Sequence, residues 1–258
     1  ELNLGIIQGR LSQPVNGHIQ EFPNDWRREF ELLQECGLSH IEWLITKGSA
    51  ETNPAFNVDI SLSELPISSL CADTLVDKRI VDIEYLREHL TPICESAVRN
   101  AISTITIPLL EESSVENSDI RREFKGNIVE FTKNFPNLKF SFECELPTEE
   151  LCDILELSDN FYVTYDTGNI TSYGLRHEEY IDAIYERINN VHLKDRTYDA
   201  KTVYPSSGDT DFKAIFRNLT SLGYEGPYTM QTARGSTGNE INTILEHKQV
   251  LQGLYNAK

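Results

Sequence analysis

The chain has 258 residues, of which 39% are hydrophobic, and its 23 Lys and Arg stand against 41 Asp and Glu, for a net charge of −18. Because such a charge repels polyphosphates and anionic lipid surfaces, the composition argues against nucleic acid and membranes as partners. We find no signal-peptide pattern and no run of about 18 apolar residues, so the cytoplasm is the expected location.

The first half of the chain alternates short apolar runs with amphipathic helical patterns. The apolar runs predict strands over residues 4–8, 40–45, 67–72 and 104–109. The periodic segments predict helices over 25–36, 80–100 and 118–135, and Pro92 is expected to kink or break the second of these. Residues 47–63 are expected to form a long loop with a short helix inside it.

The second half repeats this unit, and each apolar run ends in a residue that could hold a metal ion. The runs KFSFE, FYVTYD, NNVH and PYTMQ end at Glu143, Asp166, His192 and Gln231. Helices are expected over 149–157, 176–187, 211–222 and 238–254. A strand, loop and helix that recur about every 32 residues predict an α/β fold, a single (β/α)8 TIM barrel.

The length and the cysteines bound the architecture further. About 250 residues is typical of one such barrel, and no linker or charge block marks a boundary, so we expect one domain over residues 1–258. The five cysteines are odd in number, lack a CxxC pair and lie in apolar or helical segments, which predicts reduced core thiols. A homo-oligomer is compatible with the sequence.

The four residues at the strand ends are candidate ligands of one divalent ion. Ligands at the carboxyl ends of successive parallel strands converge only if the sheet closes into a barrel. Two carboxylates, one imidazole and one amide oxygen favour Mn²⁺, Mg²⁺ or Co²⁺ over Zn²⁺. In the alternative interpretation, Glu143 and Asp166 cap helices or pair with Lys194 and Arg196. His192 would then be a hydrogen-bonded core histidine.

Motifs over nearly the whole chain carry a family resemblance: LGIIQGRLS, GLSHIEW, ISSLCAD, ITIPLLE, FSFECELP, VTYDTGN, INNVHLKDR, SGDTDFKAIF and GYEGPYTMQTAR. They resemble the sugar isomerase and epimerase superfamily with the xylose-isomerase-like barrel, which includes ketose 3-epimerases, inosose dehydratase and type IV apurinic endonucleases. In its epimerase-like members a Glu, an Asp, a His and a second Glu hold the metal, and the glutamates are the acid–base pair. The resemblance assigns these ligand positions to Glu143, Asp166, His192 and Gln231.

Gln231 departs from that pattern, because an amide cannot take and return a proton. Epimerisation by two glutamates is therefore disfavoured, and isomerisation or elimination with one base stays open. In such an isomerisation Glu143 or Glu145 would shuttle a proton between adjacent carbons of a metal-stabilised enediolate. Lys194, which strand alternation turns inward with His192, is a candidate second acid or base, unless it forms an ion pair at the rim.

Five further residues are candidate substrate contacts. Asn169 stands where the ketose epimerases have a substrate-contacting His, and an amide still donates and accepts hydrogen bonds. Glu42, at the end of the second strand, is a similar candidate unless it pairs with Arg10. Arg10, Arg196 and Arg234 follow strand ends and could bind a phosphate or carboxylate, although they could also neutralise nearby acids.

The leading hypothesis is a metal-dependent isomerase or epimerase of a small sugar or sugar phosphate, with dehydration of a keto-cyclitol or sugar acid as a close variant. An apurinic endonuclease is disfavoured, because that chemistry in this fold uses more His ligands around several zinc ions. The non-enzymatic alternative is a barrel that binds a sugar without converting it. One ion per chain would support the isomerase, several zinc ions the nuclease, and none the binding protein.

Overall fold

The structure is a computed structural model that describes residues 2–77 and 80–258. Its barrel strands are β1 (Leu4–Ile7), β2 (Ile41–Leu44), β3 (Ile67–Cys71), β4 (Thr104–Leu109), β5 (Lys139–Cys144), β6 (Phe161–Asp166), β7 (Ile188–Leu193) and β10 (Tyr228–Met230). They close in the order β1-β10-β7-β6-β5-β4-β3-β2. The predicted (β/α)8 TIM barrel is confirmed, and every strand boundary lies within one residue of its prediction.

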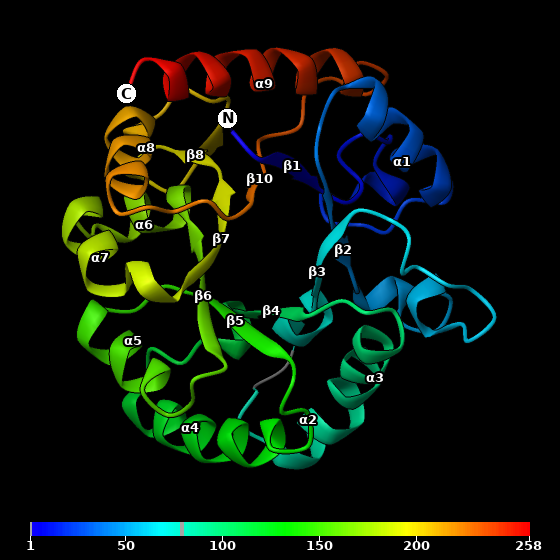
Figure 1. The fold of residues 1–258 in the computed structure, drawn as a ribbon, viewed down its shortest axis with the longest axis vertical. Helices are drawn as coiled ribbons and strands as arrows, with labels where there is room; N and C mark the ends of the chain where they lie inside the picture. Colours follow the sequence, from blue (N-terminus) through cyan, green and yellow to red (C-terminus); the bar gives the residue numbers. More distant parts are fainter. Residues whose placement is uncertain (1, 78–79) are drawn as a thin grey trace. The chain divides into compact units, whose positions relative to one another are not determined.

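The chain divides into two compact units: a first unit of Glu1–Ile41 with Tyr165–Lys258, and a second unit of Glu42–Thr164. In the first unit β1, β10 and β7 lie side by side, and α8 packs on α9 (Figure 1). Its helices are α1 (Trp26–Glu35), α6 (Thr167–Tyr173), α7 (His177–Ile184), α8 (Phe212–Ser221), α9 (Glu240–Asn256) and the 3-10 turns η1 (Val15–Gly17) and η6 (Tyr185–Arg187). A separate antiparallel pair, β8 (Asp195–Arg196) and β9 (Thr202–Val203), follows β7.

In the second unit β3, β4 and β5 pair in parallel, and α2 packs on α3 and α4 (Figure 1). Its helices are α2 (Ile83–His89), α3 (Thr91–Arg99), α4 (Ser118–Thr132), α5 (Thr148–Leu155) and the 3-10 turns η2 (Lys47–Ser49), η3 (Pro54–Phe56), η4 (Asp73–Asp77) and η5 (Glu111–Ser113). Phe142 of β5 is fully buried and packs edge-on against Phe124 of α4 and Phe161 of β6, at centroid distances of 5.8 and 5.1 Å.

One local prediction is confirmed, and two local features differ from prediction. The helical pattern over 80–100 forms two helices, α2 and α3, because Pro92 stands in the first turn of α3 and has no N–H to donate. The loop over 47–63 holds two short 3-10 turns rather than one helix. Helix α6 was not predicted, since it begins directly after the last strand residue with no intervening loop.

Polar side chains on the inward face of the strands show which residues point into the barrel. In the first unit Thr229 Oγ1 lies 2.9 Å from His40 Nε2 and donates to Asn190 Oδ1 at 3.0 Å. In the second unit the hydroxyl groups of Ser141 and Thr164 lie 2.6 Å apart. Because side chains alternate along a strand, residues two positions further on point the same way. The strand-end residues of the predicted site are in phase with this layer.

The state of the cysteines agrees with the sequence. All five cysteines are free thiols; four are buried and Cys152 is half-buried. Among the described residues, no helix is both long and apolar enough to cross a membrane.

Candidate metal and substrate site

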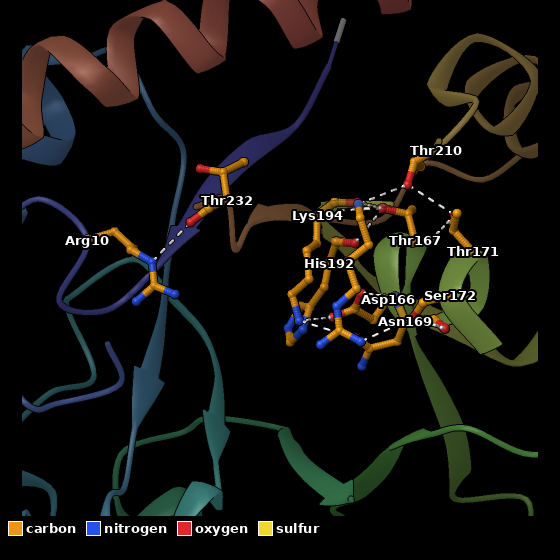
Figure 2. A network of polar contacts seen from close by, with 11 residues as sticks. Arg10, Asp166, Thr167, Asn169, Thr171, Ser172, His192, Lys194, Thr210 and Thr232 are labelled. Carbon is orange, nitrogen blue, oxygen red and sulfur yellow. Dashed lines mark hydrogen bonds and ion pairs between the residues drawn. The ribbon is translucent and has the colours of Figure 1, made fainter. Parts of the chain in front are cut away.

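Asp166 is the last residue of β6 and the N-cap of α6. Its Oδ1 accepts a hydrogen bond of 2.9 Å from the Asn169 main-chain N–H. Its Oδ2 lies 2.9 Å from the Lys194 ammonium, and the exposed fractions of the two side chains are 1% and 11% (Figure 2). The helix N-terminus therefore fixes the carboxylate, and the alternative predicted for Asp166, a helix cap paired with Lys194, is present in the structure.

The charge state of Asp166 follows from these neighbours. Burial by itself would raise the pKa of this carboxyl group, but the Lys194 ammonium, His192 and the Asn169 N–H hold it below its ordinary value. Asp166 is therefore a carboxylate at neutral pH, as a metal ligand must be.

Lys194 extends from the end of β7 across the first turn of α6. As strand alternation predicts, it turns to the same side as His192, and its ammonium also donates to Asn169 Oδ1 at 3.3 Å. A Cβ atom on Gly168 would lie 2.9 Å from Lys194 Cγ, so only glycine leaves room for the lysine side chain here. Thr167 Oγ1 donates to the Lys194 carbonyl group at 2.7 Å and so ties α6 to β7.

His192 and Gln231 lie at the carboxyl ends of neighbouring strands. His192 is fully buried and stands in register with Thr229, and the Gln231 N–H donates to the Leu193 carbonyl group at 3.1 Å. Gln231 Oε1 is buried and has no hydrogen-bond partner among the described residues. A buried acceptor without a partner costs free energy, which a bound cation would offset. The Asp166 carboxylate, the His192 imidazole and the Gln231 amide oxygen therefore fit a divalent ion.

The second unit contributes three candidate carboxylates. Glu143, on β5, is 5% exposed and is in phase with the inward-pointing Ser141. Glu145 follows the strand and is half-buried. Glu42 is fully buried and accepts hydrogen bonds from Ser69 Oγ at 2.9 Å and from Thr106 Oγ1 at 2.6 Å. Within this unit Phe142, next to Glu143, pairs with Val163 of β6.

The three arginines of the predicted anion pocket make different contacts. Arg10 donates to the carbonyl group of Thr232 (Figure 2) and to that of Ile19. Arg234 donates through Nε, Nη1 and Nη2 to the carbonyl groups of residues 19, 12 and 9. Arg196 Nη1 donates to Ser172 Oγ at 3.2 Å. Arg10 and Arg234 thus hold the segment that follows β1, and the anion pocket stays a prediction.

Two further buried carboxylates, those of Glu29 and Asp195, anchor the loops around these strand ends. Glu29 of α1 is 1% exposed and accepts hydrogen bonds from Gly9 N, Leu11 N and Ser12 Oγ at 2.8, 3.2 and 3.0 Å. Burial raises its pKa to about 7. Asp195 is fully buried and accepts from the N–H groups of residues 208 and 210 in the loop after β7. In the sequence Glu29 is an ordinary polar position of an amphipathic helix, so its hydrogen bonds to the loop are known only from the fold.

A family model and one characterised relative match parts of the chain. Residues 141–254 match the model of the family described as xylose isomerase-like TIM barrel. Inosose dehydratase of Geobacillus thermodenitrificans (strain NG80-2) is 27% identical over a segment that covers 41% of this chain and 42% of that enzyme. The match therefore spans less than half the length of this relative.

Solved structures share the fold over nearly the whole chain. The 3-keto-D-glucoside 4-epimerase of E. coli has a TM-score of 0.71 at 16% identity and covers 98% of this chain and 100% of its own. The IOLI protein with a bound zinc atom has a TM-score of 0.72 at 15% identity, with coverages of 98% and 99%. A xylose isomerase-like barrel of Mycobacterium smegmatis in complex with magnesium has a TM-score of 0.64 at 16% identity, with coverages of 98% and 97%. The family model over residues 141–254 and the shared fold confirm the resemblance of this chain to the xylose isomerase-like TIM barrels.

Proposed function

We propose that this protein is a divalent-metal-dependent isomerase or epimerase of a small sugar or sugar phosphate. The observation that carries the proposal is the Gln231 amide oxygen, buried without a described partner beside the strand that carries His192. Asp166, His192 and Gln231 would hold the ion. Glu143 would complete the ligand set, since it groups with Asp166 and His192 as potential metal ligands.

A bound divalent ion supplies a Lewis acid that polarises the sugar carbonyl group and makes the adjacent carbon more acidic. The oxygen-rich ligand set favours Mn²⁺, Mg²⁺ or Co²⁺. Zinc in the IOLI structure and magnesium in the M. smegmatis structure are compatible with a divalent ion in this fold.

The chain's own residues would move the proton. Glu143 would take a proton from the hydroxyl-bearing carbon next to the carbonyl group and return it to the former carbonyl carbon, while the proton of that hydroxyl group passes to the former carbonyl oxygen. The half-buried Glu145 is the alternative base. Asn169 and Lys194 would donate hydrogen bonds to sugar hydroxyl groups. Because Gln231 cannot act as a base on the opposite face, we expect aldose–ketose isomerisation to exceed 3-epimerisation.

Dehydration is the second candidate, and the match to inosose dehydratase favours it. In this reaction Glu143 would remove the proton next to the carbonyl group, and a neighbouring acid would protonate the departing hydroxyl group. Both reactions start with the same proton transfer, so one experiment reports on both.

That experiment is solvent deuterium exchange. We expect the protein loaded with Mn²⁺ to transfer deuterium from heavy water into at least one member of a panel of aldoses, ketoses, their phosphates and keto-cyclitols, measured by NMR and mass spectrometry. Protein treated with EDTA is the control and should incorporate none. An aldose–ketose pair would identify the isomerase, and loss of water the dehydratase. If loaded protein leaves the whole panel unlabelled, the sugar-binding barrel without catalysis is the better account.

A further inference from the structure

We propose that Lys194 is a built-in competitor of the divalent ion: its ammonium and the ion contend for the same oxygen, Asp166 Oδ2. This inference rests on the proposed metal site and adds a residue that sets the affinity of the site for the ion. It assigns Lys194 to metal affinity, where the sequence suggested acid–base chemistry or an ion pair.

The two oxygens of Asp166 have different partners. The Oδ1 atom accepts the Asn169 N–H at 2.9 Å and is held by the start of α6. The Oδ2 atom has the Lys194 ammonium at 2.9 Å. A helix N-terminus cannot move aside without unwinding its first turn, whereas a lysine side chain can rotate. The oxygen available to a ligand is therefore the one that Lys194 now holds.

Burial makes this competition strong. The exposed fractions of the Lys194 and Asp166 side chains are 11% and 1%, so water screens their charges weakly. An ammonium group and a divalent cation on one buried carboxylate repel each other. Ion binding therefore requires the ammonium to leave Asp166.

The Lys194 ammonium has a second partner for that movement. The lysine stem lies close over Gly168, where an added Cβ would come within 2.9 Å of Lys194 Cγ. Asn169 Oδ1, at 3.3 Å from the ammonium, offers a weaker acceptor that carries no charge. Once displaced, the ammonium would remain beside the site as a hydrogen-bond donor for a sugar hydroxyl group. The same residue would thus hold the carboxylate before loading and contact the substrate after it.

Calorimetric titration with Mn²⁺ tests the competition without any sugar. Lys194→Met keeps most of the side-chain volume and removes the charge, and we expect it to lower the dissociation constant for Mn²⁺ at least about tenfold. Gly168→Ala keeps the charge but pushes the lysine stem away from Asp166, and should tighten binding in the same direction. Lys201→Met is the matched control, because Lys201 pairs with Asp199 in an exposed ion pair, and should leave the constant unchanged.

The outcomes separate this inference from the proposed function. Unchanged or weaker Mn²⁺ binding in Lys194→Met, with folding verified by thermal melting, would overturn the competition even if the natural protein exchanges deuterium into a sugar. Tighter binding in both Lys194→Met and Gly168→Ala would support it, even if no sugar in the panel is labelled. Absence of binding in every variant would overturn both, since Asp166 would not be a metal ligand.

Discussion

Replacing Glu143 by Gln is expected to lower turnover about 10²- to 10⁴-fold, while the dissociation constant for Mn²⁺ changes by less than about tenfold. The amide keeps one ligand oxygen, but it cannot accept the proton that the proposed reaction moves. The measurement is the rate of solvent deuterium incorporation, read beside a calorimetric titration of the same variant.

Glu145→Gln is the matched control for this substitution. Glu145 is half-buried beyond the end of β5, so we expect its variant to keep at least about a tenth of the natural rate. Natural turnover in Glu143→Gln would remove Glu143 as the base. Loss of activity confined to Glu145→Gln would transfer that role to the neighbouring carboxylate.

The free energy of unfolding is expected to fall by about 3 kcal/mol between pH 4.5 and pH 7 through Glu29 alone. Burial raises the pKa of this carboxyl group from 4.5 to about 7 in the folded protein, so in that interval the folded state binds a proton that the unfolded state releases. The contribution of Glu29 to the free energy of unfolding is therefore fully present below pH 4.5 and is lost as the pH rises through about 7.

Urea denaturation at several pH values measures this effect. We expect the difference in unfolding free energy between the natural protein and Glu29→Gln to change by about 3 kcal/mol over the interval, while Glu31→Gln, an exposed change on the same helix, shows no such trend. Parallel pH profiles for the natural protein and Glu29→Gln would contradict the burial argument.

The barrel strands were predictable because they are short apolar runs bounded by polar turns. FYVTYD and TITIPL coincide with β6 and β4, since strands buried on both faces leave an uninterrupted apolar signal. Helix α6 was missed because TGNITSY is rich in Gly, Thr and Asn, which are weak helix formers. Its start depends on the Asp166 cap, and its end on Gly174 in the left-handed conformation, and neither signal is strong in isolation.

The site was predictable in its strand-end residues but not in its contacts. Alternation along β7 correctly predicted that Lys194 points inward with His192, because the direction of the side chains along a strand repeats every two residues. The partners of Arg10 and Arg234 are main-chain carbonyl groups of a loop, which no side-chain pattern records. The space that Gly168 leaves for Lys194 likewise exists only once α6 and β7 are packed together.

The proposed metal site requires four strand ends to meet at one ion. A crystal of the protein grown with Mn²⁺, measured at the manganese absorption edge, tests this directly. We expect one anomalous peak with Glu143, Asp166, His192 and Gln231 each placing an oxygen or nitrogen atom within about 2.0 to 2.6 Å of it. A peak elsewhere, or no peak with Lys194 still on Asp166 at saturating Mn²⁺, would contradict the proposed metal site.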